Sequence, residues 1–245
     1  MPTVKQSAPG PDRESHPEAI GRHEMRIMNS RGRELLLKYW DFPVFASALS
    51  RCGLTLEGKS LLDAGCGSGY SLGLIWERFR PAALAAFDVV PSQVEAARKR
   101  NTPATVFVAD ITSLELPPES FDAAFVCGVL HHCREWRKGL AEMARVLKRG
   151  GVLLIEEPGV AHLKFERMLT GKSPSLDAGF SFEALAAEMH RSGLGILVQR
   201  PLYFGLFRSY LCVKGAGAAQ DHYAFRRPVR AMNSGELGSG QEVPA

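Results

Sequence analysis

The chain has 245 residues, of which 45% are hydrophobic, so it can bury the core of one substantial α/β domain. Its formal net charge of +4 is mild, and it has no run of lysine and arginine interleaved with aromatic residues, so nucleic acid is not expected as a partner. The five cysteines, at positions 52, 66, 127, 133 and 212, include no C-x-x-C pair. This odd number argues against a disulfide framework and fits a reducing compartment.

The two ends of the chain differ from its middle. Residues 1–20 and 215–245 are rich in Gly, Pro, Ala, Ser and charged residues, and we expect both to be loosely ordered tails. No apolar stretch approaches the ~20 residues that cross a bilayer, and the first residues lack the apolar region of a secretion signal. We therefore expect a cytoplasmic protein without a membrane span, with a helical cap at 21–58 and the main domain at 59–214.

Strand and helix patterns alternate through the main domain. Short apolar runs predict strands at 60–64, 84–87, 105–109 and 121–126, and helical spacing predicts helices that end near Phe79 and Arg100. A helix that starts near Trp136 is expected to end at Gly150 and Gly151, before a fifth strand, VLLIEE. Ser181 is expected to cap a helix that stops at Gly193. Two further strands are predicted near 196–204 and 209–214.

This alternation predicts an α/β fold, because βαβ units with right-handed crossovers form an open parallel sheet with helices on both faces. The last two strands are joined without room for a helix, so they are expected to pair as an antiparallel hairpin. Ligands of such sheets bind beyond the carboxyl ends of the strands. Candidate site residues should therefore lie just after strands.

The segment LLDAGCGSGY, residues 61–70, places three glycines at alternate positions after the first strand. Glycine is used where φ is positive or where a ligand approaches the main chain too closely for a Cβ. Asp88 ends the second strand, nineteen residues after Gly69, where a nucleotide-binding fold places a carboxylate for ribose hydroxyls. Asp110 ends the third strand and could accept a hydrogen bond from an adenine amine or cap a turn. An adenosine-containing ligand is indicated.

The glycine spacing does not match a dinucleotide site. The motif G-x-G-x-x-G requires a third glycine where this chain has Tyr70, counting from Gly65, or Leu72, counting from Gly67. The segment instead reads D-x-G-x-G-x-G, with Asp63 at the strand end. The loop thus shows no adaptation for a pyrophosphate.

LLDAGCGSGY resembles the first motif of the class I S-adenosylmethionine-dependent methyltransferases, and AFDVVPSQVEAARKR resembles their second. The stretch from VADITSLEL to VLLIEEP is similar to the small-molecule branch related to ubiquinone and menaquinone methyltransferases. The resemblance covers about residues 60–158 and implies a Rossmann-like, seven-stranded, mostly parallel sheet with an antiparallel terminal hairpin and a small N-terminal helical cap. Small departures are Arg149, where proline is common, and Val89 and Val90, where the family is often more polar.

The resemblance also implies roles in binding S-adenosylmethionine, whose product would be S-adenosylhomocysteine. Asp63 would lie near the methionine head, and Gly65, Cys66 and Gly67 would line it. Asp88 would hold the ribose, and Cys127 would contribute its backbone carbonyl. The remaining implied contacts are to adenine, from Val89, Asp110 and Ile111.

His131 and His132 stand where a neutral imidazole could take a proton from the methyl acceptor. The same pair could instead orient the loop through hydrogen bonds. The run CGVLHHC also offers two thiols and two imidazoles, but its spacing is unlike that of structural zinc sites. We therefore expect no metal.

Substrate recognition should lie outside the matched core. We expect a lid formed by two aromatic-rich segments, one before the first strand and one after the fifth; its apolar members would be Tyr39, Trp40, Phe42, Phe45, Phe165, Met168 and Phe180. The alternative is that these residues pack onto the sheet. Arginines at 22, 26, 31 and 33 could meet an acidic group of the substrate.

The sequence predicts a methyltransferase that acts on a small-molecule O, N or C nucleophile. A nicotinamide-dependent oxidoreductase is a second reading, disfavoured by Tyr70. A protein that binds S-adenosylmethionine without catalysis is a third, since an intact cofactor pocket does not show that an acceptor is methylated.

Overall fold

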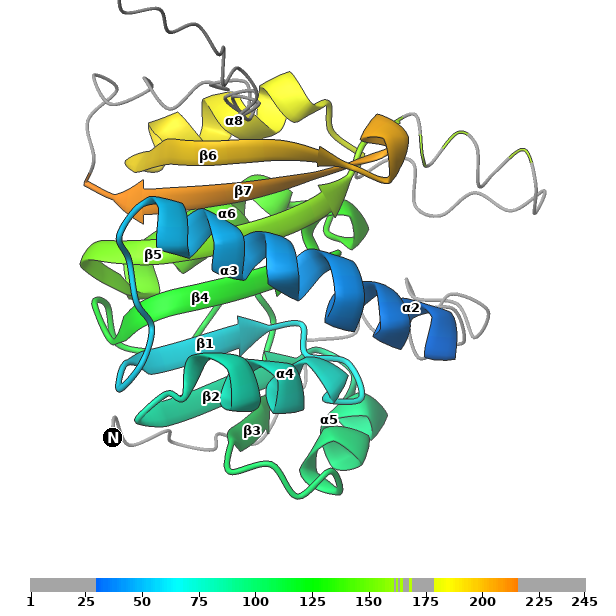
Figure 1. The fold of residues 1–245 in the computed structure, drawn as a ribbon, viewed down its shortest axis with the longest axis vertical. Coiled ribbons are helices and arrows are strands. Elements are labelled where there is room, and N and C mark those ends of the chain that lie inside the picture. The colour runs from blue at the N-terminus through cyan, green and yellow to red at the C-terminus, as the bar shows by residue number, and fades with distance from the viewer. Residues whose placement is uncertain (1–29, 161, 163, 165–167, 169–178, 216–245) are drawn as a thin grey trace, which may run out of the picture.

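The computed structural model describes residues 30–160, 162, 164, 168 and 179–215 (Figure 1). The sequence-predicted tails at 1–20 and, beyond residue 215, at the other end, together with Arg22, Arg26 and Phe165, lie outside these residues. Seven strands form one sheet in the order β3-β2-β1-β4-β5-β7-β6. The strands are β1 (Ser60–Ala64), β2 (Ala83–Asp88), β3 (Thr105–Val108), β4 (Phe121–Cys127), β5 (Leu147–Pro158), β6 (Leu194–Leu202) and β7 (Phe207–Lys214).

Five strands run parallel, and β7 pairs antiparallel with both β5 and β6. The predicted α/β class, mostly parallel sheet and antiparallel terminal hairpin are confirmed. The parallel strands end at the same edge of the sheet, on the right of Figure 1. The segments that follow β1, β2, β3 and β4 therefore converge there.

Helices cover both faces of the sheet. On one face lie α3 (Phe42–Arg51), α4 (Tyr70–Phe79) and α5 (Pro91–Arg98), and on the other lie α6 (Trp136–Val146) and α8 (Phe182–Arg191). Each face of the sheet packs against its helices to form a hydrophobic core, and alternate residues of each central strand point into one core or the other. Leu61 packs with α3 and α4, whereas Leu62 packs with the α6 side. This two-sided burial explains why β1 reads as a continuous apolar run.

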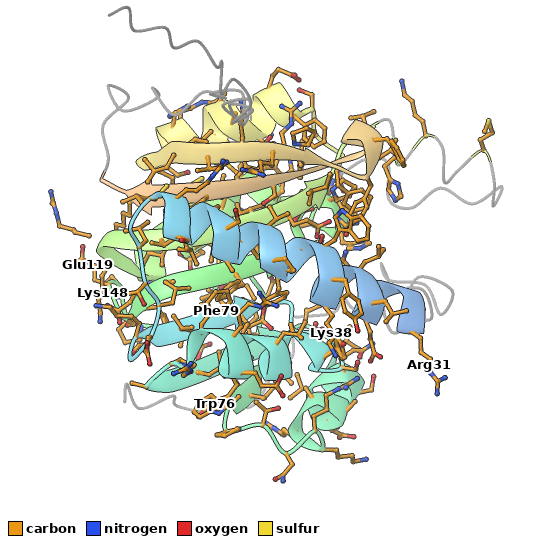
Figure 2. All side chains as sticks on the ribbon, in the orientation of Figure 1. Arg31, Lys38, Trp76, Phe79, Glu119 and Lys148 are labelled. Atoms are coloured by element: carbon orange, nitrogen blue, oxygen red, sulfur yellow. The ribbon has the colours of Figure 1, made fainter. Side chains whose placement is uncertain are left out.

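The N-terminal segment continues into the first helical layer. Ser30 caps α2 (Arg31–Leu36), and a single π-helical turn, η1 (Leu37–Asp41), leads into α3. Phe42 and Phe45 are fully buried, and both rings pack against Phe125 of β4. These two aromatics belong to the core and not to the predicted lid. Tyr39 and Trp40 are exposed, as is Arg31, which points away from the body of the molecule (Figure 2).

The prediction that the helix from Trp136 ends at Gly150 and Gly151 is wrong. The helix ends at Val146, and β5 begins at Leu147, which pairs with Phe121 of β4. Pairing resumes only at Val152 opposite Ala123, so the residues between them, including Gly150 and Gly151, form an irregular stretch inside the strand. Gly150 has φ of +72°, which suits a bulge. The glycines therefore bend a strand and do not terminate a helix.

The predicted helix 182–191 is capped as expected, because the Ser181 hydroxyl accepts a hydrogen bond from the Ala184 N–H at 3.1 Å. Phe180 packs on Trp136 with ring centroids 4.8 Å apart and is buried, so it too is a core residue. Met168 is exposed. No helix among the described residues is long and apolar enough to span a membrane.

Candidate functional site

The three glycines after β1 have different structural reasons. A Cβ on Gly65 would lie 2.5 Å from Cγ2 of Val129, and one on Gly69 would lie 2.8 Å from the Cα of Ala97. A Cβ on Gly67 would meet no atom within 4 Å, although its φ is +52°. Gly65 and Gly69 thus permit close packing of neighbouring segments, whereas Gly67 leaves space beside the main chain.

The glycine turn is joined to the end of β2. The N–H groups of Gly65 and Cys66 donate to the Phe87 carbonyl at 2.8 and 2.9 Å. The Asp88 carboxylate accepts from the Gly67 N–H and the Val90 N–H, both at 2.9 Å. Asp88 is buried, which raises its pKa, whereas these backbone donors lower it. The carboxylate therefore sets the position of the turn that the sequence assigned to the cofactor.

Asp63 lies beneath the turn. It is 2% exposed, and its carboxylate accepts a hydrogen bond from the Ser71 hydroxyl at 2.5 Å. Burial raises the pKa of Asp63 to about 7, against the opposing effect of Ser71. A carboxylate held in this way gains from a nearby cation, which would favour its ionised form.

One pocket lies beyond the carboxyl ends of β1 to β4. Of the sequence-predicted residues it brings together Gly65, Asp88, Val89, Asp110, Ile111 and His132. Asp110 also closes a turn, because its Oδ1 accepts from the N–H and hydroxyl of Thr112, both at 2.8 Å. Gly128 and Cys133, from the run CGVLHHC that the sequence marks after the fourth strand, also line it. The lining residues that sequence reasoning did not single out are Phe87, Ala109, Thr112, Val129, Arg134 and Glu135.

Five predicted site residues do not line this pocket: Asp63, Cys66, Gly67, Cys127 and His131. Asp63 and Cys66 are buried under the glycine turn. Burial raises the pKa of the Cys127 thiol well above its ordinary value, so that side chain is not a thiolate nucleophile. Among the described residues no group of three or more His, Cys, Asp or Glu side chains is arranged to hold a metal ion.

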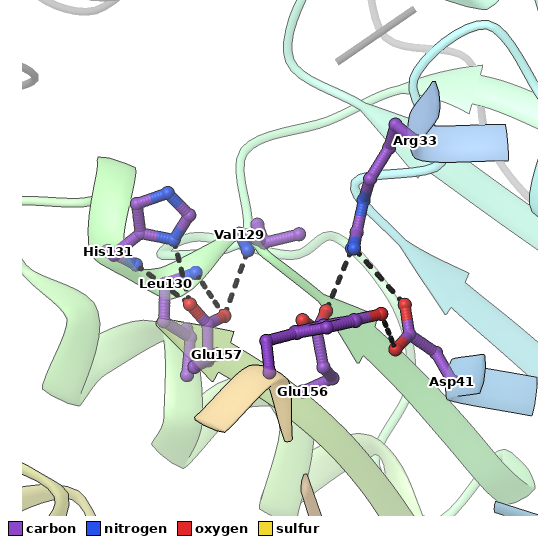
Figure 3. Close-up of polar contacts among 8 residues, drawn as sticks. Arg33, Asp41, Val129, Leu130, His131, Glu156 and Glu157 are labelled. Carbon is purple, nitrogen blue, oxygen red and sulfur yellow. Dashed lines mark hydrogen bonds and ion pairs between the residues drawn. The ribbon is translucent and has the colours of Figure 1, made fainter. Parts of the chain in front are cut away.

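The adjacent histidines differ in their surroundings. His131 Nδ1 lies 2.8 Å from Oε2 of Glu157, which is fully buried at the end of β5 (Figure 3). The other oxygen of Glu157 accepts from the N–H groups of Val129 and Leu130 at 2.8 and 2.7 Å. Burial lowers the pKa of His131 to about 3 and raises that of Glu157 to about 7. His131 is therefore a neutral ring tied to the strand, whereas His132 lines the pocket.

A second polar cluster, which we call the Arg33 cluster, comprises Arg33, Asp41, Glu156 and Tyr203. Arg33 contacts Asp41 Oδ2 at 3.1 Å and Glu156 Oε2 at 2.8 Å, and the Tyr203 hydroxyl donates to Asp41 Oδ1 at 2.5 Å. Figure 3 shows the Glu156 carboxylate between Asp41 and Glu157. Glu156 and Glu157 follow the apolar run VLLI, so the strand-end rule that found Asp88 and Asp110 could also have found them.

Buried carboxyl groups are concentrated at this edge of the sheet. The buried acidic residues of the described chain are Asp41, Asp63, Asp88, Glu156 and Glu157. Buried carboxylates are costly unless they are hydrogen-bonded or paired, and Arg33 pairs with only two of them. The edge is therefore suited to a positively charged ligand.

A seven-stranded sheet of this order, with a glycine turn after β1 and an acid ending β2, defines an α/β domain of the Rossmann-like class. The family model described as a methyltransferase domain matches residues 62–155. The match covers less than half of the chain, and over these residues the chain is similar to the methyltransferases that its motifs resemble.

Known proteins show the same relationship. The chain is 36% identical over 102 residues to a malonyl-[acyl-carrier protein] O-methyltransferase of Serratia marcescens, covering 42% of this chain and 39% of that protein. It is 34% identical over 108 residues to a tRNA U34 carboxymethyltransferase of Hahella chejuensis, covering 41% of this chain and 32% of the relative. The chain thus spans well under half the length of these relatives.

Among solved structures, an S-adenosylmethionine-dependent methyltransferase from Mesorhizobium loti superposes with a TM-score of 0.60 at 16% identity, covering 70% of this chain and 96% of that one. At this level of identity, the likeness establishes the fold alone.

Proposed function

We propose that the protein binds S-adenosylmethionine at the pocket beyond β1 to β4 and transfers its methyl group to a small-molecule O, N or C nucleophile. The observation that carries the proposal is the pocket at the carboxyl ends of the strands, which brings Gly65, Asp88 and Asp110 together, with the Asp88 carboxylate also holding the Gly67 N–H of the glycine turn. A cofactor with a sulfonium and an ammonium group suits these carboxylates, whereas the diphosphate of a nicotinamide dinucleotide would be repelled by them.

The residues would then divide the cofactor between them. Gly65 and Gly67 would accommodate the methionine part, with Cys66 in the same turn. Asp88 would accept from the ribose hydroxyls. Val89, Asp110 and Ile111 would surround the adenine, and the Cys127 carbonyl would face the methionine head. These roles follow the family resemblance together with the lining of the pocket.

When bound, S-adenosylmethionine supplies an activated methyl carbon for in-line displacement, so the chain must chiefly align the acceptor. Such positioning is worth ~7–11 kcal/mol in favourable systems. His132 lines the pocket and is the better-placed imidazole for a proton from the acceptor. His131 has its Nδ1 on Glu157 and would hold the turn that carries His132.

The acceptor class does not follow from the relatives, because their names give a malonyl group on an acyl-carrier protein and a tRNA. The pocket lies at the edge of the sheet where the buried acidic residues gather. Few basic side chains border it, and Arg134 is among its lining residues. These features favour a small molecule over a polyanion.

The test replaces Asp88 by asparagine. Asp88→Asn keeps the shape of the side chain but removes its charge and one acceptor, so S-adenosylmethionine affinity should fall by ~1.5–3 kcal/mol, measured by titration calorimetry. Glu95→Gln, on the exposed side of α5, is the matched control and should bind normally. Binding of NADH in place of S-adenosylmethionine by the unmodified protein would refute the proposal.

A further inference from the structure

The Arg33 cluster joins three distant segments at the same sheet edge. Arg33 and Asp41 come from the N-terminal helical segment, Glu156 from the end of β5, and Tyr203 from the 3-10 turn η3 (Tyr203–Gly205). Asp41 and Glu156 are fully buried. Two carboxylates share one guanidinium, so the cluster carries a formal excess of negative charge in the interior.

One oxygen of this cluster lacks a partner. Glu156 Oε2 accepts from Arg33, but Oε1 is buried and no donor in the described chain reaches it. Both oxygens of a buried carboxylate normally accept hydrogen bonds, because an oxygen that is removed from water without a new partner costs free energy. Glu156 Oε1 can therefore accept a hydrogen bond from a further donor. The formal negative charge of the cluster favours a positively charged donor.

The cluster lies directly behind the wall of the cofactor pocket. The Glu156 carbonyl accepts from the N–H of Gly128, a residue that lines the pocket, at 2.7 Å. A Cβ on Gly128 would lie 3.5 Å from Arg33 Nη2 and 3.7 Å from Cε1 of His131. A side chain at Gly128 would therefore contact both the Arg33 guanidinium and the His131 imidazole.

We propose that the Arg33 cluster is the recognition subsite for the methyl acceptor and that it takes an amine, with Glu156 Oε1 accepting from the ammonium group. This inference rests on the proposed function, since it assigns the acceptor of the same site. Arg33 is already occupied by Asp41 and Glu156, so it does not serve the acidic substrate group that its sequence position suggested. A carboxylate at this position would face two carboxylates across one shared arginine.

The binding requires the buried oxygen to become accessible, and two of the three segments have backbone suited to a shift. Asp41 ends a single π-helical turn, a feature frequent at functional sites. Tyr203 and Phe204 have φ of +48° and +58°, conformations that side chains other than glycine rarely adopt.

The test uses the full chain with deuteromethyl S-adenosylmethionine and a cell metabolite extract, followed by mass spectrometry before and after chemical derivatisation of amines. Labelled products should derive from amine-bearing molecules. Glu156→Gln places an amide N–H₂ where Oε1 lies, so it should lower labelling of those products about tenfold or more. Affinity for S-adenosylhomocysteine should be unchanged in this variant, which also reports that it folds. Glu95→Gln is the charge-matched control.

Different failures point to different errors. Labelled products that lack an amine, or a Glu156→Gln enzyme with unchanged labelling, would overturn the amine subsite while leaving the methyltransferase activity in place. If Glu156→Gln does not fold, Asp41→Asn tests the same excess charge, and unchanged amine labelling would again overturn the inference. Normal cofactor binding with no labelled product at all would contradict the proposed function itself and the subsite with it.

Discussion

At the residue scale, the glycine turn shows that identical residues in one motif need not do the same work. Gly65 and Gly69 are required because a Cβ at either would collide with Val129 or Ala97. Gly67 has free space around it, so packing does not explain it, and only its positive φ and the approach of a ligand remain as reasons. Gly67 is therefore the glycine of this turn at which we propose that a ligand approaches the main chain.

This difference can be measured with Gly67→Ala and Gly58→Ala. Both glycines have positive φ, +52° and +69°, and both have open space at the Cβ. The Gly67 N–H donates to Asp88, which lines the pocket, whereas Gly58 precedes β1 at the opposite edge of the sheet. Each variant should lose ~1–2 kcal/mol of unfolding free energy from backbone strain, measured by chemical denaturation. Only Gly67→Ala should also lose S-adenosylmethionine affinity, about tenfold or more by calorimetry. Equal affinity in the two variants would show that no ligand approaches Gly67.

The sequence located Asp88, Asp110 and the glycines because each follows a strand directly, and local pattern reveals strand ends. The same rule extends to Glu156 and Glu157, the acids directly after VLLI, which the sequence analysis does not single out. The ion pair between Arg33 and Glu156 could not be predicted in this way, because 123 residues separate the two partners in the sequence. Nothing local pairs them, and only the packing of the N-terminal segment across the sheet edge brings them together.

At the scale of elements, Glu157 connects two pieces of structure. It is the part of β5 that fixes η2 (Leu130–His132), through the N–H groups of Val129 and Leu130 and the His131 ring. The short 3-10 turn has few hydrogen bonds of its own, so its position depends on this carboxylate. Val129 and His132 line the pocket, and their placement therefore depends on a buried strand residue.

Glu157→Gln should loosen this turn. The amide places N–H donors opposite the His131 N–H and ring, so one or more bonds are lost and the free energy of unfolding should fall by ~1–3 kcal/mol. S-adenosylmethionine affinity should fall as well, because the turn forms one wall of its pocket. The exposed Glu119→Gln serves as the control for removal of a glutamate charge. Stability equal to that of the control would show that Glu157 does not hold the turn.

Element boundaries were predicted well where one signal dominated. The Ser60–Ala64 strand and the end of α4 at Phe79 agree with the sequence pattern. The end of α6 was wrong because a double glycine was read as a helix terminator, whereas Leu147 is drawn into the sheet by pairing with Phe121. Likewise Phe42 and Phe45, expected in a lid, pack on Phe125, a contact that sequence position could not reveal.

At the scale of the whole molecule, the buried acids at one edge act together on stability and binding. Burial raises the pKa of Asp41, Asp63 and Glu157 to about 7 in each case and lowers that of His131 to about 3. In the unfolded chain the carboxyl groups titrate near ~4 and the histidine near ~6.5. Folded and unfolded states therefore bind different numbers of protons between about pH 4 and 7.

Between about pH 4 and 7, each carboxyl group whose pKa is raised holds a proton in the folded state that the unfolded chain has released. Its contribution to stability is therefore full below pH ~4 and is lost as the pH rises to about 7. His131 opposes this, because its contribution is full above ~6.5 and is lost as pH falls toward about 3. Three carboxyls outweigh one imidazole, so the unliganded protein should unfold at a lower temperature at about pH 8 than at about pH 6.

A cationic cofactor reverses this dependence, because it favours the ionised carboxylates. S-adenosylmethionine should bind more tightly at about pH 8 than at about pH 6, and binding near neutral pH should release protons. Calorimetry in two buffers of different ionisation enthalpy measures that release directly. Asp63→Asn removes one titrating carboxyl beside the glycine turn, so it should reduce both the proton release and the fall in unfolding temperature. Two results would contradict this view of the sheet edge. One is proton uptake on binding, and the other is a protein that, without cofactor, becomes more stable from about pH 6 to 8. Either would show that the buried carboxyl groups at this edge do not favour a cationic ligand.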